Sequence, residues 1–496
     1  MQEKIVDTLR GLGRVYDLLL KARAGLGTRS ESSDDSVMSR ASERRLFLVG
    51  GTIRDIILGR TPDDFDFAVS GSGLEFAAAF ARKIRGRLVV LSVPDDEARV
   101  VYHKEVVLDF NGFGDKDIES DIRRRDFTAN ALAIEVLPDG VGELLDLVGG
   151  QRDIAAKLIR PVSDQSLKSD PLRLLRGMRL ALELGFDIDP AVYEQGRAAS
   201  LMGTAPERIG AEVLRIMEQP GAAVLVVKLY ELGKLAEIIP DLVPVLEDDQ
   251  LRRHTFKTFE KIEELIARPG FFAKFEPEWT TYFDRWDAEA PEEPGLPYRR
   301  ALLKLAGLLH DIAKPQTRFI NTDGEVHFYG HDSLGARVIA HLAREHLRLS
   351  RPQAAMLKRL TAEHMRLHLL ATSSDLTDRA IRRYFHDLGP EALGLMILCV
   401  ADGWATAGRT SHLEDTIARM IEQKREEDAK ASIKRFVTGD DLIALGMKPG
   451  PAFKVILQEL QDLQVEGKID SKEAGIEYLK THLTGLVAVD GQHQRP

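Results

Sequence analysis

The sequence has very little cysteine: Cys399 is the single thiol among 496 residues. One cysteine excludes a disulfide framework and a cluster of thiolate metal ligands. Because Cys399 lies in the apolar run LGLMILCV, we predict a small buried hydrophobic residue there rather than a reactive thiol. A chain without disulfides suits the reducing cytosol.

The sequence also lacks the marks of a targeting segment or a membrane span. The N-terminal stretch MQEKIVDTLRGLGRVYDLLLKARAG has helical spacing but carries acidic residues throughout, unlike a signal or transit peptide. We expect no stretch to be apolar for long enough to span a bilayer. The prediction is a cytoplasmic protein without a membrane partner, and the oligomeric state stays open.

Positive charge is in deficit, because the formal net charge is −10. This charge excludes a general nucleic-acid coat, but phosphate binding needs only a local cluster of Lys and Arg. Some basic residues crowd one segment and others are scattered near the C-terminus: Lys157, Arg160, Lys168, Arg173, Arg176 and Arg179, then Lys448, Lys454, Lys468 and Lys472. Solvated helix faces are the alternative explanation for any few of them.

The chain is too long for one hydrophobic core, so several domains are expected. Runs such as RRLFLVG, DFDFAV and RVVYHKEVVLDF predict a mixed α/β region, and helical patterning follows it almost to the end. The predicted units are an N-terminal helix and polar linker (1–38), the α/β unit (39–162), a helical segment (163–248), a helical body with an irregular insertion near 270–298 (249–425), a C-terminal unit (426–487) and a disordered end (488–496).

The stretch LFLVGGTIRDIILGRTPDDFDFAVSG carries the first candidate site. A glycine pair, Gly50 and Gly51, between a strand and a helix lets backbone amides approach a phosphate, and Arg54 could add a charge-assisted contact. Period-two alternation sends Asp64 and Asp66 to one strand face, where two carboxylates suit Mg²⁺. Asp109, at the end of VVLDF, is the candidate third carboxylate. The alternative is an exposed strand with solvated acids.

Three further motifs are each ambiguous alone. In DIRRRDFTANALAIE, the arginines suit a triphosphate and Asp126 with Asn130 suits a ribose, but a charged loop is the alternative. In SDPLRLLRGMRLALELGF, Asp170 and Arg173 are predicted to lie one helical turn apart on one face. They could bind a base edge, or form an ordinary salt bridge. DLVGGQRDI, with Asp146 and Asp153, is most simply a turn.

Taken together, these motifs resemble the bacterial class II tRNA nucleotidyltransferase and poly(A) polymerase family. They occur in the family's order across residues 46–217, and the C-terminal GDDLIALGMKPGP also resembles the family's tail. The matching residues are Gly50, Gly51, Arg54, Asp55, Asp64 and Asp66; Arg124 to Ala131; Asp146 to Gly150 in altered form; Asp170 to Arg176; and Glu207, Arg208, Ile209 and Glu212.

The resemblance implies an α+β protein with a polymerase-β-like nucleotidyltransferase head followed by an all-α neck, an HD body and a tail. It implies that Asp64 and Asp66 hold Mg²⁺, with Asp109 as a further catalytic carboxylate. The tRNA 3′ end would attack the α-phosphate of CTP or ATP, and Asp170 and Arg173 would pair with the incoming base. The implied nucleotide-binding residues are Gly50, Gly51, Arg54, Arg125, Asp126, Asn130, Asp170, Arg173, Arg176 and Arg179.

One position departs from the family pattern. The family usually has Glu before the Asp of the base-pairing motif, and this chain has Ser169. Serine can form a hydrogen bond but cannot hold an arginine by charge. The departure leaves open whether the whole CCA end is added, or only its C residues, or only the final A.

A second candidate site lies in the helical body. LLKLAGLLHDIAKP contains the adjacent His310 and Asp311 of the HD phosphohydrolase pattern, and imidazole with a bridging carboxylate suits transition metals. The other ligands in HD order are His254, His331, His364 and Asp402. Any one of these histidines could be structural. The set implies a divalent metal and a phosphodiesterase or phosphatase activity on nucleotides or RNA ends.

Three rival functions remain at this point. A poly(A) polymerase of the same family would extend general RNA. An HD phosphohydrolase could use the head only to sense nucleotides. A pure RNA-binding scaffold would not need the carboxylates and the complete HD set.

Overall fold

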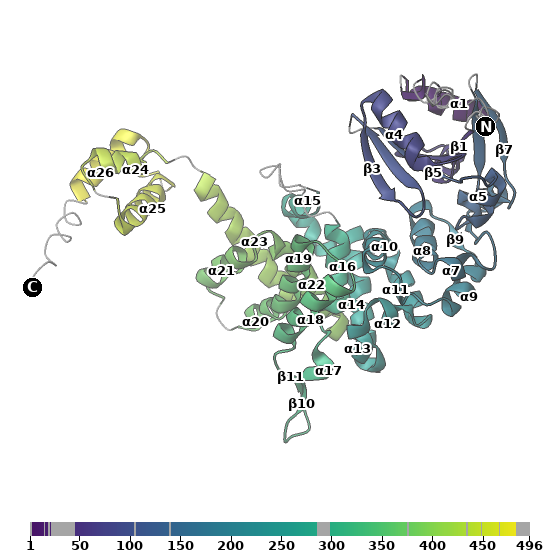
Figure 1. The fold of residues 1–496 in the computed structure, drawn as a ribbon. Coiled ribbons are helices and arrows are strands. Elements are labelled where there is room, and N and C mark those ends of the chain that lie inside the picture. The colour runs from purple at the N-terminus through teal and green to yellow at the C-terminus, as the bar shows by residue number, and fades with distance from the viewer. Residues whose placement is uncertain are drawn as a thin grey trace, which may run out of the picture.

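A computed structural model describes residues 2–13, 15–17, 20, 45–103, 106–137, 140–284, 298–373, 376–432, 435–447, 449–465 and 467–482. A head with a β-sheet, a helical neck, a helical body and a small helical tail follow one another along the chain (Figure 1). Most of the predicted linker, Lys448, residues 285–297 of the predicted insertion and the predicted disordered end lie outside the described residues.

In the described part of the head, seven strands form one mixed sheet in the order β3-β4-β5-β2-β1-β6-β7. β2 and β5 pair in parallel, and the other neighbours pair antiparallel. The strands are β1 (Leu46–Val49), β2 (Asp64–Val69), β3 (Arg87–Ser92), β4 (Glu97–Tyr102), β5 (Val106–Gly112), β6 (Ala133–Leu137) and β7 (Gly140–Leu145).

Apolar side chains bury both faces of the central strands. On β2, Phe65 and Phe67 point into the main core, where Phe67 stacks on Phe110 of β5 at 5.4 Å. A second core lies on the other face and includes Phe47 and Ile122. The helical elements of the head are α1 (Gln2–Gly11), α3 (Gly51–Ile57), α4 (Gly73–Ile84), α5 (Ile118–Arg124), η1 (Thr128–Asn130) and α6 (Gly150–Ala155).

A short parallel ladder ties the head to the neck. β8 (Leu158–Ile159) ends the head and pairs with β9 (Asp187–Ile188), which lies between the first neck helices. The helical elements of the neck are α7 (Ser166–Ser169), α8 (Arg173–Leu184), α9 (Pro190–Ala198), α10 (Pro206–Glu218), α11 (Ala222–Glu231), α12 (Lys234–Ile238), η2 (Pro240–Leu242) and α13 (Val243–Glu247).

Two central helices of the body are buried almost all round, α16 (Arg299–Leu309) and α22 (Ala392–Ala407). Cys399 on α22 is fully buried and its thiol donates to the carbonyl of His364, which confirms the prediction of a small buried residue. The other body elements are α14 (Asp249–Ala267), η3 (Gly270–Phe275), α15 (Glu276–Asp284), α17 (Lys314–Thr317), β10 (Arg318–Ile320), β11 (Val326–Phe328), α18 (His331–Glu345), α19 (Arg351–Glu363), α20 (Arg366–Thr372), α21 (Asp378–Leu388), η4 (Gly389–Glu391) and α23 (Ser411–Ser432).

One segment corrects the expectation about apolar runs. Residues 378–407 are long and apolar enough to cross a membrane by length and composition alone. The segment contains α21 and α22, and Gly389 with a φ of 54° separates them. Most of its apolar window is buried inside the protein, so the core position of α22 accounts for this composition.

The tail has a hydrophobic core of its own, which includes Val437, Leu442 and Leu460. Its helices are α24 (Gly439–Ala444), α25 (Pro451–Val465) and α26 (Lys472–His482). In Figure 1 the tail lies beyond the end of α23 and apart from the other helices of the body. Because α23 is continuous from 411 to 432, the predicted boundary at 425 falls inside a helix.

Candidate functional sites

Strand register brings the predicted head carboxylates together. In the parallel pairing of β2 with β5, Asp66 lies opposite Asp109, and Asp64 precedes Asp66 on the same face of β2. The Gly50 turn lies directly beside Asp66. Gly50 has a φ of 70°, and a Cβ there would lie 3.2 Å from Oδ2 of Asp66 and 3.0 Å from Nη1 of Arg125. Only glycine fits this close approach.

The three carboxylates crowd negative charge into a partly buried place. Burial, and next the charge of Asp64, raise the pKa of Asp66 to about 6. Burial also raises the pKa of Asp64, and the charge of Asp109 adds to it. A divalent cation would relieve this repulsion, and hard carboxylate oxygens are the ligands that Mg²⁺ prefers. The donor set therefore fits Mg²⁺.

Arg99 on β4 is a site residue that sequence reasoning missed. It lies opposite Asp109 in the β4–β5 register. Its Nε and Nη2 donate to the two oxygens of Asp109 at 2.8 and 2.7 Å, and Nη2 lies 3.9 Å from Asp64. In sequence, Arg99 is one charged residue on a strand, and only the strand pairing assigns it to the carboxylates.

We expect Arg99→Ala to lower kcat for nucleotide addition about 10²-fold. The two hydrogen bonds from Arg99 hold the Asp109 carboxylate in place, and a misplaced catalytic group lowers the rate by about this factor. Arg99→Lys should recover part of the rate. Arg87→Ala, an exposed arginine on the neighbouring strand β3, is the matched control. Steady-state kinetics with equal melting temperatures would check this, and an unchanged kcat in Arg99→Ala would contradict it.

A buried network joins the glycine turn to the RRDFT motif and to α8. Arg54 donates to both oxygens of Asp55 and, at 2.6 Å, to the amide oxygen of Asn130. The Asn130 amide donates to Asp126 at 3.3 Å, and Arg176 donates twice to Asp126. Burial alone would raise the pKa of Asp126. The charge of Arg176 and the hydrogen bonds that Asp126 accepts outweigh burial and lower this pKa.

These partners change how the predicted nucleotide-binding residues are understood. The guanidinium of Arg54 is engaged with protein groups, and Asp126 and Asn130 are buried. Arg125, beside them, donates to Asp121 at 2.9 Å and borders the Gly50 turn. The network holds the turn in position, and direct contact of its members with a nucleotide stays a prediction.

The structure corrects the predicted arrangement of Asp170 and Arg173. They do not share a helix face, because α8 begins at Arg173 and Asp170 has an extended backbone, with a φ of −147°. Asp170 accepts from Arg208 at 2.8 Å. The guanidinium of Arg173 donates to the carbonyls of Arg124, Arg125 and Ser166.

The remaining predicted residues of the head and neck have structural partners. The Ser169 hydroxyl donates to the carbonyl of Ser166, which also accepts from Arg173. Arg179 donates to Glu212 at 2.7 Å. Asp146 accepts the backbone amides at the start of α6, which confirms turn chemistry for that motif.

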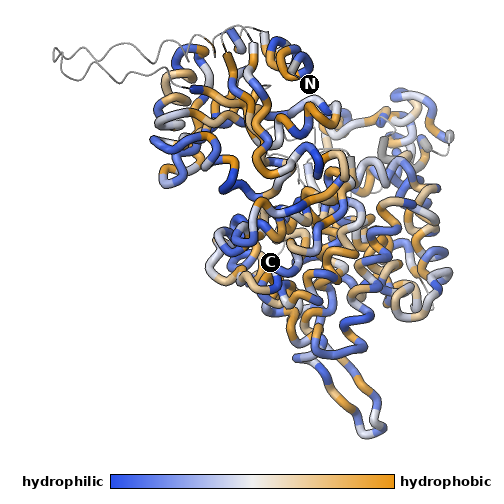
Figure 2. Tube along the Cα trace, turned by 90° about the vertical axis from the view of Figure 1, so that its right-hand side faces the viewer, coloured by the Kyte–Doolittle hydropathy of each residue, from blue (hydrophilic) through white to orange (hydrophobic). Residues whose placement is uncertain are grey.

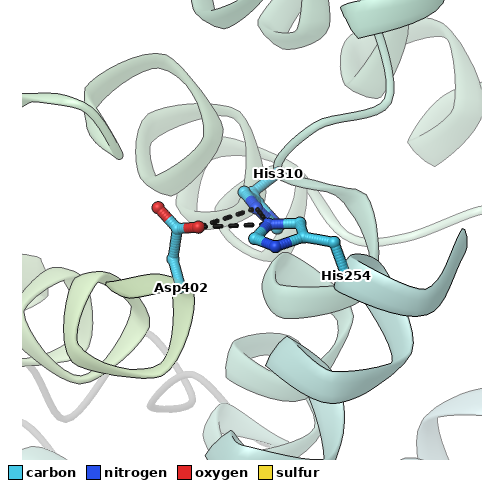
Figure 3. Close-up of side chains that lie close together, drawn as sticks. All are labelled: His254, His310 and Asp402. Atoms are coloured by element: carbon cyan, nitrogen blue, oxygen red, sulfur yellow. Dashed lines mark hydrogen bonds and ion pairs between the residues drawn. The ribbon is translucent and has the colours of Figure 1, made fainter. Parts of the chain in front are cut away.

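The predicted HD residues form one cluster in the body. His254 of α14, His310 at the end of α16 and Asp402 of α22 point toward one another (Figure 3). The Nε2 of His254 lies 3.3 Å from Nε2 of His310 and 3.1 Å from Oδ1 of Asp402. A second group, Asp311, His331 and His364, adjoins the first.

Asp311 bridges the two groups. Its Oδ2 lies 3.4 Å from Nε2 of His254 and 3.2 Å from Nε2 of His310, and its Oδ1 lies 3.5 and 3.6 Å from Nε2 of His331 and His364. Both carboxylate oxygens are buried, and among the described residues Oδ1 accepts no hydrogen bond, whereas the Nζ of Lys314 lies 2.6 Å from Oδ2. One oxygen therefore faces each group, as in a bridging metal ligand.

The imidazole rings are oriented for metal binding. The Nδ1 of His310, His331 and His364 donates to the carbonyls of Gly307, Phe328 and Thr361. This leaves Nε2 of each ring as the inward lone pair. The Nε2 atoms of His331 and His364 lie only 3.0 Å apart, a contact that a shared cation would stabilise. The residues present therefore fit a pair of divalent metal ions.

Known proteins match the chain over both sites. Residues 46–160 match the family of poly(A) polymerase head domains and residues 251–407 match the HD domain family. The chain is 30% identical to the A-adding tRNA nucleotidyltransferase of Deinococcus radiodurans, over 86% of this chain and 93% of that protein. It is 31% identical to the CC-adding tRNA nucleotidyltransferase of Thermus thermophilus, over 87% of this chain and 92% of that protein.

The chain belongs to the tRNA nucleotidyltransferase family. The structure of a Thermotoga maritima CCA-adding enzyme complexed with tRNA is similar to it with a TM-score of 0.56, at 18% identity, over 96% of this chain and 98% of that chain. This likeness confirms the predicted fold class of a nucleotidyltransferase head followed by helical domains.

Sequence reasoning missed two residues of the second site. The His368 Nε2 lies 2.9 Å from Oδ2 of Asp402, and the other oxygen, Oδ1, faces His254. The Lys314 Nζ lies 2.6 Å from Oδ2 of Asp311. Both had a sequence signal, since His368 follows His364 by four residues and Lys314 follows Asp311 by three.

Proposed function

We propose that the protein adds nucleotides to the 3′ end of tRNA from CTP or ATP. The observation that carries the proposal is the register that sets Asp64, Asp66 and Asp109 side by side, with the Gly50 turn against Asp66. Asp64 and Asp66 would hold Mg²⁺, which when bound favours deprotonation of the attacking hydroxyl and stabilises the leaving pyrophosphate. The glycine turn allows a triphosphate to come close to the backbone beside these carboxylates.

The neck residues would select the base. Asp170 offers carboxylate acceptors and Arg173 offers guanidinium donors, the two group types that a nucleobase edge requires. Both groups now hold protein partners, so base pairing would require them to exchange these partners. Three backbone carbonyls orient the guanidinium of Arg173. A glutamate at position 169 would orient this guanidinium by charge, and here the carbonyls would do so instead.

The test uses tRNA transcripts ending at the discriminator base, at C or at CC, with Mg²⁺ and CTP, ATP or both. We expect the enzyme to add C residues, the final A or the complete CCA end, and to add nothing beyond it. Ser169→Glu tests whether charge at this position alters the nucleotides added, and Ser169→Gln is the uncharged control of equal size. Long A tails would instead indicate a poly(A) polymerase. No incorporation on any transcript would overturn the proposal.

A second proposed activity is metal-dependent hydrolysis of phosphate esters of nucleotides or RNA ends at the HD cluster. The observation that favours it is Asp311, with one carboxylate oxygen toward each group of histidines. His254, His310 and Asp402 would hold one metal, and His331 and His364 the other. Imidazole-rich ligand sets favour transition metals over Mg²⁺, and bound metals of this kind supply a hydroxide nucleophile. Both activities fit a cytoplasmic enzyme.

A further inference from the structure

The body carries a two-stranded hairpin that projects away from its helices (Figure 2). β10 and β11 flank a turn in which Asn321 accepts the backbone amides of Asp323 and Glu325. The exposed fractions of the hairpin side chains Phe319, Ile320 and Tyr329 are 54, 57 and 70%. Large apolar side chains exposed together on a projecting element indicate a binding surface.

Three aromatic rings gather on one face of this hairpin. Phe319 lies opposite His327 in the register, and Tyr329 follows His327 by two residues, so the three share a face. The rings of His327 and Tyr329 stack at 5.2 Å with 13° between their planes, and those of Phe319 and Tyr329 lie 6.3 Å apart. We call Phe319, His327 and Tyr329 the aromatic face.

The aromatic face adjoins the HD cluster. The carbonyl of Phe328, between His327 and Tyr329, accepts from Nδ1 of the cluster residue His331 at 2.6 Å. Only two peptide links separate Tyr329 from His331, so their Cα atoms lie within about 7.6 Å of each other. A molecule with its phosphate at the cluster could therefore place an attached ring on the aromatic face.

Two cations lie at the base of the hairpin, on its other face. Lys314 lies at the base, with Nζ 2.6 Å from Asp311 and 5.5 Å from the Phe328 ring centre. Arg318 begins β10 and is exposed. The acidic Glu325 accepts from the side chain of Asn321 within the turn. Arg318 pairs with Phe328, so it lies on the face opposite the aromatic face, where Lys314 also meets the Phe328 ring. These cations therefore suit a phosphate at the cluster, and the aromatic face alone offers rings for a base.

We infer that the aromatic face binds the base of an unpaired nucleotide whose phosphate lies at the HD cluster. This inference rests on the proposed hydrolytic function and assigns a nucleobase site to it. Stacking would not select one base over another, since every base has a π face. The ligand would come either from a free nucleotide or from the last unpaired residue of an RNA.

The experiment measures fluorescence quenching of 2-aminopurine by the full-length protein in metal-free buffer. The probes are 2-aminopurine riboside 5′-monophosphate and a single-stranded RNA ending in 2-aminopurine. We expect Tyr329→Leu to weaken binding of at least one probe about tenfold, the size of one lost stacking contact, and Tyr329→Phe to retain it. Val224→Ala, which changes an exposed apolar residue on α11 of the neck, is the control.

The outcomes separate the two proposals. Weakening for the RNA alone would assign the site to RNA ends, and weakening for the monophosphate would assign it to free nucleotides. Equal binding by Tyr329→Leu and the unchanged protein, with both folded by circular dichroism, would overturn the inference and leave a protein-docking surface as the explanation. Because the assay contains no metal and no hydrolysis, failure of the hydrolytic proposal would not alter this readout.

Discussion

Asp66→Asn is expected to abolish nucleotide addition and to stabilise the head. Asparagine keeps the shape but loses the charge that a divalent cation needs, so the rate should fall by about 10³-fold or more. The carboxylate is crowded by Asp64 and Asp109, and its pKa of about 6 reflects the cost of ionising it there. Removing that charge should increase the free energy of unfolding at neutral pH by about 1–2 kcal/mol.

Two measurements check this prediction. Primer extension on a tRNA transcript gives the rate, and thermal unfolding in a chelating buffer gives the stability. Asp63→Asn is the matched control, because Asp63 is exposed and precedes the strand. Asp64→Ala should also abolish addition while leaving phosphate ester hydrolysis intact. More than a tenth of the normal rate in Asp66→Asn would contradict the assignment of this carboxylate.

Asp311→Asn is expected to abolish metal binding and hydrolysis in the body without changing nucleotide addition. Asp311 offers one oxygen to each group of imidazoles, so a neutral amide would leave both proposed metal ions without their shared anionic ligand. The head carboxylates lie on the β-sheet, and the described residues that contact them belong to the head. The same loss is expected for His310→Ala.

Titration calorimetry with Mn²⁺, Co²⁺ and Ni²⁺ on chelator-treated protein measures this effect directly. In an Asp64→Ala background, which removes the proposed metal site of the head, about two ions per chain are expected, because the cluster contains two ligand groups. Asp332→Asn removes an acid beside His331 that accepts a backbone amide, and it serves as the control. Undiminished metal binding by Asp311→Asn, or loss of nucleotide addition with it, would contradict the prediction.

The error over Asp170 has a local cause that the sequence contains. Pro171 follows Asp170, and a residue before proline is disfavoured in the helical region by a clash with the proline ring. Asp170 is accordingly extended, and α8 begins two residues beyond the proline, at Arg173. Helical periodicity, when it is extended across this proline, predicts Asp170 and Arg173 on one helix face, whereas only Arg173 belongs to the helix.

Local pattern placed the candidate residues of both sites, and the resemblance of the whole set of motifs to a known family gave those residues a function. Alternation along one strand was enough to put Asp64 and Asp66 on one face, because side-chain direction in a strand depends only on parity. The glycine pair predicted a close backbone approach, and the spacing of His310 and Asp311 predicted a metal site. Each of these inferences needs residues that are near neighbours in the chain.

Only the tertiary structure decided which distant groups meet. Arg99 reaches Asp109 because β4 and β5 pair in one particular register, and a one-residue shift would turn it to the opposite face. Asp170 meets Arg208 because α8 and α10 pack together. These contacts depend on packing between elements, which side-chain periodicity within a single element does not specify.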